Sequence, residues 1–257
     1  MPTVSVIITT YNRANLVGKA IESVLNQSYR DFELIIIDNS LIDDTRRVVE
    51  SFGDKRLKCI HPEENLGSCD ALNRGLGFAN GKYIAILDDD DCWLDENKLK
   101  QQVDFLESHP EYVLVGTNII MVDEEGVELS RSCYPEKDWE IRDEMLMRNC
   151  FAHSSVMYRT LEALSFGGYS PVGVAHYSRH PDDYDLWLKL GTVGKIANLP
   201  VFSVGYTLVK KGKVLTLALE EFNLVSKYKR DYPNYWKAVW FRCVKAPCLF
   251  AVKFLKG

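Results

Sequence analysis

Apolar runs rich in β-branched residues alternate with segments of helical periodicity through residue 87 of this 257-residue chain. The run 4–9 reads as a buried strand, and the segment 12–26 then places its apolar residues on one helical face. The pattern continues with a strand over 34–37, a helix over 44–52, a strand over 57–60, a helix over 68–79 and a strand over 83–87. Strands joined by helices through short connections predict a mostly parallel sheet covered on both faces.

Polar residues follow three of these predicted strands. Thr10 to Asn12 end the first strand, Asp38 to Ser40 end the second, and four consecutive carboxylates, Asp88 to Asp91, end the fourth. Ligands of open α/β sheets bind beyond the carboxyl ends of the strands. These three strand ends are therefore predicted to converge on one site.

The four adjacent carboxylates constrain the chemistry of that site. Like charges at the end of a buried strand repel one another unless a cation lies among them, although a solvated acidic turn is the alternative. The chain has no Gly-x-Gly-x-x-Gly after the first strand and no Gly-x-x-x-x-Gly-Lys-Ser/Thr, so the dinucleotide and P-loop modes of phosphate binding are not supported. A divalent metal that leaves positions open for diphosphate oxygens is the expected substitute.

Composition excludes other classes of function. A net charge of −5 and a pI near 5.6 argue against nucleic acid as a partner. Seven scattered cysteines without a Cys-x-x-Cys pair predict neither a disulfide framework nor a zinc site. The N-terminus lacks the features of a signal peptide, and no uncharged apolar stretch approaches about 18 residues. The sequence therefore predicts a cytoplasmic protein without a membrane span.

An ordered set of motifs resembles the family-2 glycosyltransferases with the GT-A fold. The motifs lie at 5–13 (SVIITTYNR), 23–29 (SVLNQSY), 38–40, 44–45, 65–67 (NLG), 87–91 (LDDDD), 153–159 (HSSVMYR), 167–169 (GGY) and 182–190 (DDYDLWLKL). The resemblance covers roughly residues 3–207. It implies an α/β GT-A domain over 1–207, with a nucleotide-sugar half (1–95) and an acceptor half (96–207), followed by a C-terminal helical extension over 208–257.

The resemblance also implies residues that hold the nucleotide-sugar donor. These are Thr10, Tyr11, Asn12, Arg13, Asp38, Asn39, Asn73, Asp88 and Asp89. Two positions depart from the family pattern, because Asn39 stands where an Asp is usual and Leu72 stands where an Arg is usual. Both departures concern base recognition, so uridine, thymidine and guanosine diphosphates remain open, with a UDP-sugar favoured.

The metal, Mg²⁺ or Mn²⁺, is assigned by the same resemblance to the acidic cluster. Asp90 is the first choice of ligand, with Asp88 and His153 as further candidates. His153 opens a strand-like run, 153–157, and the alternative for a lone His is a structural role. A Lewis acid is needed because the leaving group is a nucleoside diphosphate.

Asp183 is the residue assigned to general-base catalysis. Inversion in a single displacement requires one carboxylate beside the acceptor hydroxyl, and Asp183 matches the Asp of the family's Glu-Asp pair. Asp182 and Trp187 are assigned to the acceptor. The alternatives are that the two carboxylates cap the helix that follows and that Trp187 belongs to the core.

The last part of the chain differs in composition. After Asp231 it has no acidic residue but interleaves basic and aromatic residues, which is typical of a helix at an anionic lipid surface. Pro247 predicts a kink. The alternative is a tail helix packed on the domain. Attachment through 232–257 to the inner face of the membrane would suit a saccharide acceptor on a lipid carrier in cell-surface polysaccharide synthesis.

The sequence thus predicts an inverting, non-processive, metal-dependent glycosyltransferase. Non-processive transfer is favoured because Gln-x-x-Arg-Trp and large apolar segments are missing. One alternative is a catalytically silent sugar-nucleotide-binding module, which would bind donor without turnover. Another is a nucleotidyltransferase, which would need a glycine-rich basic loop where this chain has Arg13-Ala14-Asn15.

Overall fold

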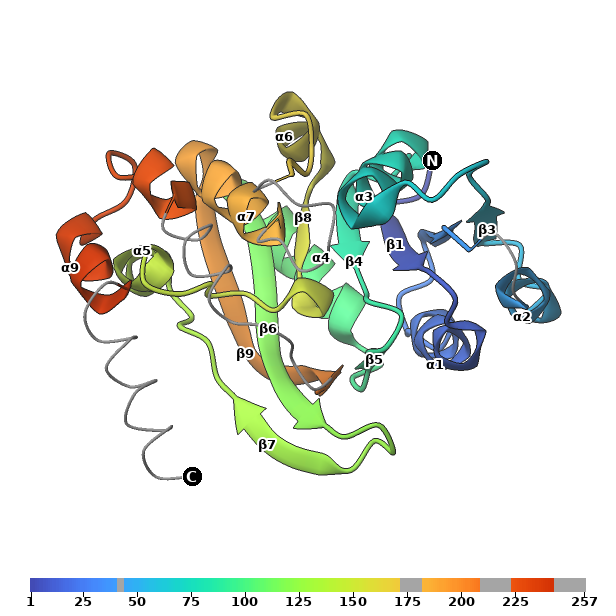
Figure 1. Ribbon diagram of the computed structural model, residues 1–257. Helices are drawn as coiled ribbons and strands as arrows, with labels where there is room; N and C mark the ends of the chain where they lie inside the picture. Colours follow the sequence, from blue (N-terminus) through green and yellow to red (C-terminus); the bar gives the residue numbers. More distant parts are fainter. Residues whose placement is uncertain (41–43, 172–181, 209–222, 243–257) are drawn as a thin grey trace, which may run out of the picture.

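The strands form one mixed sheet. The computed structural model describes residues 1–40, 44–171, 182–208 and 223–242, and within them nine strands form a sheet of order β3-β2-β1-β4-β8-β6-β9-β5, with β7 paired to β6 (Figure 1). Their bounds are β1 Val4–Thr10, β2 Phe32–Asp38, β3 Leu57–Ile60, β4 Tyr83–Ile86, β5 Cys92–Trp93, β6 Tyr112–Val122, β7 Glu128–Ser132, β8 Met157–Arg159 and β9 Lys195–Thr207. The first four strands are parallel, as are β6 and β9, whereas β5, β7 and β8 run antiparallel to their neighbours.

The helices cover both faces of this sheet. Those with bounds inside the described residues are α1 Ala14–Leu25, α2 Thr45–Ser51, α3 Gly67–Phe78, α4 Lys98–Ser108, α5 Asp138–Met145, α6 Thr160–Ser165, α7 Asp182–Val193 and α9 Tyr235–Trp240, with a short 3₁₀ helix at His153–Ser155. The predicted alternation through residue 87 is confirmed, and its element ends shift by no more than a few residues. The predicted α/β class is confirmed as well.

Strand β1 shows why its sequence is apolar at nearly every position. Ile7 lies in a hydrophobic cluster with Leu72 and Leu76 of α3. Val6 and Ile8 lie in a second cluster, which includes side chains of α1, α2 and α4. Successive residues of a strand point to opposite faces, so a strand covered on both sides has no solvent-facing position. Each such burial contributes about 1.5–3 kcal/mol to folding.

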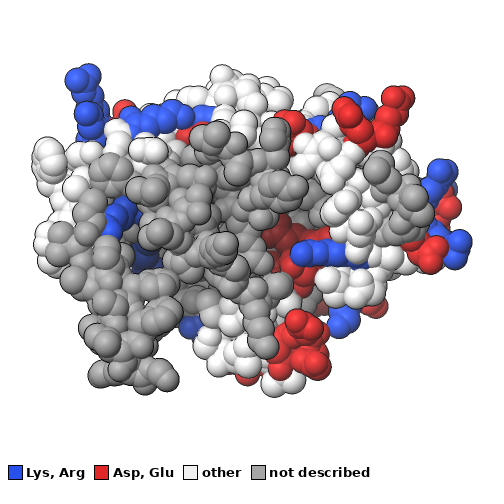
Figure 2. Space-filling view, in the orientation of Figure 1, with Lys and Arg blue, Asp and Glu red and all other residues white. Residues whose placement is uncertain are grey.

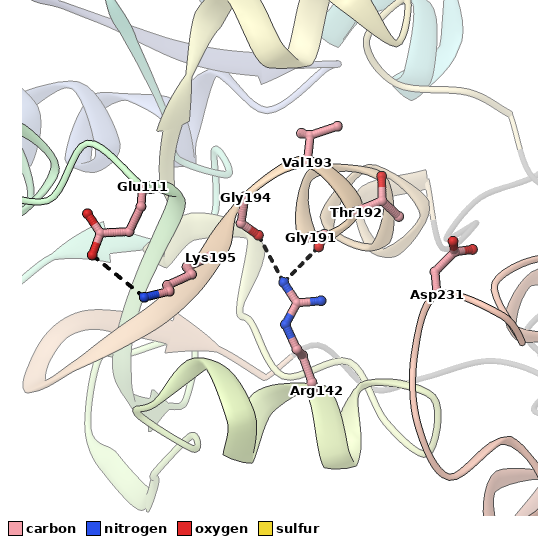
Figure 3. A pocket seen from close by; sticks show the side chains of 8 residues that line it. All are labelled: Glu111, Arg142, Gly191, Thr192, Val193, Gly194, Lys195 and Asp231. Carbon is pink, nitrogen blue, oxygen red and sulfur yellow. Dashed lines mark hydrogen bonds and ion pairs between the residues drawn. The ribbon is translucent and has the colours of Figure 1, made fainter.

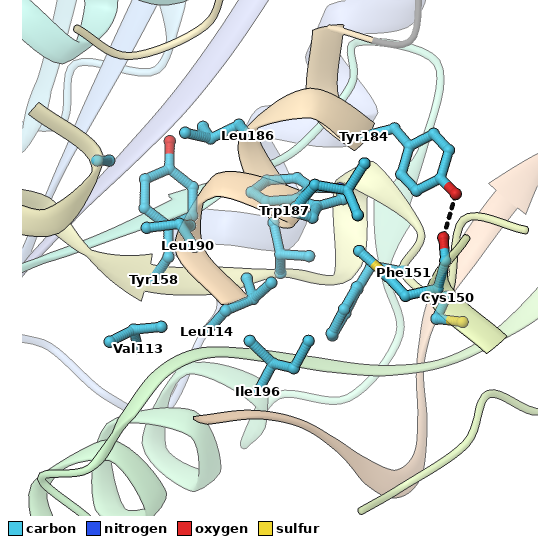
Figure 4. Packing of buried hydrophobic residues seen from close by; sticks show 14 of the residues in the cluster. Val113, Leu114, Cys150, Phe151, Tyr158, Tyr184, Leu186, Trp187, Leu190 and Ile196 are labelled. Atoms are coloured by element: carbon cyan, nitrogen blue, oxygen red, sulfur yellow. Dashed lines mark hydrogen bonds between the residues drawn. The ribbon is translucent and has the colours of Figure 1, made fainter. Parts of the chain in front are cut away.

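Trp187 of α7 belongs to the same hydrophobic cluster as Ile7, and it lies at the centre of the part drawn in Figure 4. Its side chain is fully buried, and its ring lies 5.6 to 6.5 Å, between centroids, from the rings of Phe151, His153, Tyr158 and Tyr169. The structure thus gives Trp187 the core position that was the alternative at the sequence level. Its assignment to the acceptor stays a prediction.

Part of the C-terminal extension packs on the same cluster. Leu224, Val225, Tyr228, Tyr232 and Ala238 are buried in it. Residues 243–257, including the predicted kink at Pro247, lie outside the described residues. None of the described helices has both the length and the apolar character needed to cross a lipid bilayer. Packing on the domain, which was the alternative for the last part of the chain, is therefore found at Tyr232 and Ala238, while the domain boundary at 207 remains a prediction.

A buried ion-pair group fixes this extension to α7. The Asp185 carboxylate is fully buried and lies 2.7 Å from Lys189 Nζ and 3.0 Å from Lys227 Nζ. Tyr228 Oη donates a hydrogen bond to the same carboxylate at 2.6 Å. Desolvation opposes ionisation, but these donors hold the pKa of Asp185 below its usual value. Removing one partner would leave a buried charge uncompensated.

We predict that Leu224→Ala lowers the free energy of unfolding by about 2–5 kcal/mol, because its side chain is 3% exposed within the cluster. Trp236→Ala on α9 is the matched control, since that side chain is 78% exposed and its loss should change stability by no more than about 0.5 kcal/mol. Denaturant unfolding measures both. Equal effects of the two substitutions would contradict the packing described for the extension.

Candidate active site

The ends of β1, β2 and β4 meet at one edge of the sheet, as predicted. Thr10 at the end of β1 is in register with Asp38 at the end of β2, and β4 lies on the other side of β1. The Asn39 N–H donates to the Thr10 carbonyl at 2.9 Å. The Asn12 N–H donates to Ser40 Oγ at 2.8 Å, and Asn12 has a positive φ of 54°, which turns the chain away from β1.

The second strand end presents a buried acceptor. Asn39 Nδ2 donates to the Gly67 carbonyl at 3.2 Å, whereas Asn39 Oδ1 is buried without a hydrogen-bond partner in the described part of the chain. Asp38 accepts a hydrogen bond from the Ser40 N–H at 3.0 Å and pairs with His61 Nδ1 at 3.1 Å. Tyr11, at the neighbouring strand end, is 49% exposed. An orphaned amide oxygen at one strand end and an exposed aromatic ring at the next suit a flat ligand with an N–H donor.

Arg13 pairs with the two middle carboxylates of the acidic cluster. Its Nη1 donates to Asp89 Oδ1 at 2.8 Å and to Asp90 Oδ2 at 3.0 Å. The Arg13 side chain is 42% exposed and comes from the loop between β1 and α1. Figure 2 shows acidic side chains near the middle of this face with a basic side chain against them.

The two outer carboxylates have partners from the second half of the chain. Asp88 Oδ1 lies 2.8 Å from His153 Nδ1, and the Asp88 N–H donates to Ser154 Oγ at 3.0 Å. Ser154 Oγ in turn donates to Asp91 Oδ2 at 2.5 Å, and the Thr207 N–H donates to Asp91 Oδ1 at 2.8 Å. The four carboxylates are therefore held by residues from three separate parts of the sequence.

The pKa shifts of this cluster follow from burial and from mutual repulsion. Desolvation would raise the pKa of Asp88, but the adjacent His153 holds it below the usual value. Desolvation also opposes charge on His153, yet Asp88 raises the pKa of this imidazole to about 9, so it is a cation near neutral pH. Burial raises the pKa of Asp89, and burial together with the charge of Asp88 raises those of Asp90 and, more strongly, Asp91.

The carboxylate oxygens fit a divalent metal that shares its coordination with phosphate. Mg²⁺ is commonly held by one or two carboxylates and completed by water and substrate phosphates, and Asp88 and Asp90 supply oxygen donors of this type. Within the described residues, no group of three or more His, Cys, Asp and Glu side chains forms a complete metal site. Both ring nitrogens of His153 already have partners, Asp88 and the Tyr169 hydroxyl at 3.3 Å. The assignment of His153 as a ligand stays a prediction, and its contacts favour an ion-pairing role.

Asp183 brings a further carboxylate toward the cluster from α7. It is the second residue of that helix, is partly buried, and accepts a hydrogen bond from Asn149 Nδ2 at 3.1 Å. Burial raises its pKa, which the charge of His153 and the N–H of Tyr184 partly offset, while Asp88 raises it further. The neighbouring Asp182 is buried at the first helical position. The charge of Asp183 thus acts on the same His153 that pairs with Asp88.

One local prediction around His153 is wrong. The run 153–157 does not form a strand, because His153–Ser155 is a 3₁₀ helix and β8 begins only at Met157. The turn allows Ser154 Oγ to accept from the Asp88 N–H and to donate to the Asp91 carboxylate, and it allows His153 to reach the Asp88 carboxylate. A strand would place these neighbouring side chains on opposite faces.

Asn73 has a positioning role in the structure, which differs from the predicted donor contact. Its Nδ2 donates to the Tyr169 carbonyl at 2.8 Å, and its Oδ1 accepts from the Tyr169 N–H at 2.9 Å. Gly168 has φ 76°, and a Cβ there would lie 2.4 Å from Asn73 Oδ1. Both amide groups of Asn73 are therefore engaged in holding the loop that presents Tyr169 to His153. A donor contact by Asn73 remains untested.

Several residues of the site have no predicted role in the sequence. Ser154 and Thr207 bond the acidic cluster, Asn149 bonds Asp183, and His61 bonds Asp38. Ser154 stands inside a recognised motif, so its hydroxyl was the available signal. Nothing in the sequence distinguishes the other three, because their roles arise from contacts between distant segments.

A cavity of about 450 Å³ lies away from these residues (Figure 3). It lies where α7 ends and β9 begins, which is the edge of the sheet opposite the carboxyl ends of β1, β2 and β4. Arg142 Nη2 already donates there to the carbonyls of Gly191 and Gly194 at 2.8 and 2.9 Å, and Glu111 lies 3.8 Å from Lys195. The basic groups of this cavity thus have internal partners, and the acidic cluster remains the candidate site.

One family model matches most of the chain. Residues 5–169 match the family model of glycosyl transferase family 2. This segment includes the ends of β1, β2 and β4, the acidic cluster and His153. It stops before α7 and Asp183.

Named bacterial glycosyltransferases are similar over most of the chain. EpsE of Bacillus subtilis is 35% identical over 191 residues, which cover 73% of this chain and 66% of EpsE. The amylovoran biosynthesis glycosyltransferase AmsE of Erwinia amylovora is 32% identical over 76% of this chain and 73% of its own length. WfgD of Escherichia coli, named as a UDP-Glc:α-D-GlcNAc-diphosphoundecaprenol β-1,3-glucosyltransferase, is 31% identical over 73% of this chain and 69% of WfgD. The chain thus spans about two thirds of the length of these relatives.

Solved structures confirm the GT-A fold. S. aureus TarS 1-349 in complex with UDP-GlcNAc superposes with a TM-score of 0.71 at 18% identity, covering 92% of this chain and 69% of that one. The mannosyltransferase PcManGT of Pyrobaculum calidifontis, in complex with GDP-Man and Mn²⁺, superposes with a TM-score of 0.68 at 19% identity, covering 95% and 70%. At this identity the likeness is one of fold.

Proposed function

This chain belongs to glycosyl transferase family 2, and we propose that it is an inverting, non-processive enzyme that moves one sugar from a UDP-sugar to a saccharide acceptor. One observation carries the proposal. The acidic cluster at the end of β4 pairs with His153 through Asp88, and the charge of Asp183, at the start of α7, raises the pKa of the same imidazole. A diphosphate-binding cluster and a separate base are the two parts that a single displacement requires.

The nucleotide is proposed to bind across the ends of β1 and β2. The Asn39 amide is oriented by the Gly67 carbonyl, so that Oδ1 is left to accept a hydrogen bond. Uracil offers an N–H to such an acceptor, whereas cytosine presents a ring nitrogen that itself accepts. Tyr11 offers an exposed ring for stacking. The UDP-glucose in the name of WfgD and the UDP-GlcNAc bound to TarS support uridine, while the GDP-Man of PcManGT keeps guanosine as an outcome of the test.

The metal is proposed to be Mg²⁺ or Mn²⁺, held by Asp90 and Asp88. Bound there, it would supply Lewis-acid stabilisation to the leaving diphosphate. Asp89 would then be left to Arg13 or to the ribose. The Mn²⁺ in the PcManGT complex supports the choice of a divalent ion.

Asp183 is proposed to take the proton of the acceptor hydroxyl. Its raised pKa, caused mainly by burial, makes the carboxylate a better base than an exposed Asp. Because the basic form is the deprotonated one, transfer should increase with pH through this raised pKa and should be lost below it. Asn149 would fix the orientation of the carboxylate through its hydrogen bond.

The first test is calorimetric binding of UDP, GDP, TDP and CDP with and without Mn²⁺. We expect metal-dependent binding of UDP, weaker binding of CDP, and loss of the metal dependence in Asp90→Ala. The matched control is Asp104→Ala, because Asp104 is an exposed carboxylate of α4. If no nucleotide binds, the donor site is wrong, and tight binding without turnover of any UDP-sugar would indicate a silent binding module.

The acceptor is proposed to be lipid-linked, in cell-surface polysaccharide synthesis at the inner face of the membrane. The names of WfgD and AmsE support a lipid-linked acceptor and polysaccharide synthesis, respectively. On α9, Trp236 and Trp240 are 78% and 55% exposed and stand four residues apart, on one helical face. Lys237 lies between them in sequence. Exposed indoles next to basic residues suit an anionic lipid surface.

We predict that replacing both Trp236 and Trp240 by Ser weakens binding to phosphatidylglycerol-containing vesicles about tenfold, since two indoles would no longer bury apolar surface in the lipid. Co-sedimentation with vesicles measures the change. Trp139→Ser is the matched control, because Trp139 is 62% exposed on α5 instead of α9. Unchanged binding by the double variant would exclude α9 as the membrane contact.

A further inference from the structure

Arg13 occupies the carboxylate that is proposed to hold the metal. A single guanidinium nitrogen, Nη1, bonds both Asp89 and Asp90, and Asp90 retains only 18% exposure of its side chain. The Asp90 atom in this contact is Oδ2, at 3.0 Å. A divalent ion would have to bind the same small carboxylate at about 2.0–2.1 Å. Two cations cannot share that group without mutual repulsion.

The other two carboxylates of the cluster already have partners within the chain. Asp88 pairs with His153, and Asp91 accepts hydrogen bonds from Ser154 and Thr207. Arg13 is therefore the residue whose departure would change the charge seen by a metal at Asp90.

Arg13 also has unused donors. In the described part of the chain, hydrogen bonds from its guanidinium are found only at Nη1, which leaves the N–H groups of Nε and Nη2 without a protein partner. A guanidinium binds phosphate oxygens through paired donors and in a preferred geometry. Arg13 comes from the loop between β1 and α1, beside the strand end proposed to hold the nucleotide. A diphosphate bound there offers this side chain an alternative partner.

We propose that Arg13 and the divalent cation are alternative partners of Asp90, and that the donor diphosphate draws Arg13 away and so opens Asp90 to the metal. The inference rests on the proposed donor site. It makes nucleotide and metal bind with positive coupling, because each favours the arrangement that the other needs. Coupling of this kind is reciprocal, so UDP must tighten Mn²⁺ binding by the same factor as Mn²⁺ tightens UDP binding.

The test measures Mn²⁺ affinity by electron paramagnetic resonance, without nucleotide and with saturating UDP, in the full chain. The ratio of the two dissociation constants is the coupling factor. In the wild-type protein we expect weak binding of Mn²⁺ alone and a coupling factor of at least about fivefold. In Arg13→Gln we expect Mn²⁺ alone to bind at least about fivefold tighter and the coupling factor to fall toward one.

Two controls separate exchange at Asp90 from a general loss of positive charge. Lys19→Gln removes one charge from the exposed side of α1, and no ion pair joins Lys19 to the cluster among the described residues. It should leave the coupling factor unchanged. Arg13→Lys keeps the charge as a compact ammonium that bridges two carboxylates poorly, and should show intermediate coupling.

The outcomes distinguish this inference from the donor proposal. If UDP binds with Mn²⁺ but Arg13→Gln keeps the wild-type coupling factor, Arg13 does not compete with the metal and the inference is overturned. If UDP fails to bind the wild-type protein with or without Mn²⁺, the proposed donor site itself fails. A thermal unfolding curve for Arg13→Gln with added Mn²⁺ checks that the variant is folded.

Discussion

The repulsion among four consecutive carboxylates at the end of β4 is the constraint on which the site depends. Their positions follow from the covalent chain, so the fold has to bring compensating groups to them. It does so from distant segments, with Arg13 after β1, His153 and Ser154 before β8, and Thr207 at the end of β9. The acidic cluster thereby links the two halves of the sheet. The chain supplies two cations of its own where the sequence suggested only a metal.

His153 connects the acidic cluster with α7. Its imidazole pairs with Asp88, lies against Trp187 of α7 and reaches the hydroxyl of Tyr169. Trp187 follows Asp183 by one helical turn, so the packing of its ring fixes the helix that carries the proposed base. A small displacement of His153 would therefore affect both the acidic cluster and Asp183. The packing of His153 against Trp187 thus holds the acidic cluster and Asp183, which come from distant parts of the sequence, in one arrangement.

The sequence was sufficient to predict the sheet and the polar residues at its strand ends, because both follow from local patterns. The alternation of strands with helices predicts parallel connections, and these place Asp38 and Asp88 at one edge of the sheet without knowledge of packing. It was insufficient where a role depends on contacts between distant residues. The amide of Asn73 is used by the backbone of Tyr169, and Arg13 bonds Asp90, although 77 residues separate that pair. A motif identifies such residues but leaves their partners undetermined.

The proposed mechanism requires Asp183 to take the proton of the acceptor hydroxyl while the sugar donor is held at the acidic cluster. The most direct measurement is the single-turnover rate of sugar transfer by Asp183→Asn, together with the dissociation constant of its UDP-sugar donor. Loss of a general base predicts a rate about 10²–10⁴-fold lower, with donor affinity nearly unchanged. An unchanged rate, or a loss of donor affinity as large as the loss of rate, would contradict the assignment of Asp183 as the base.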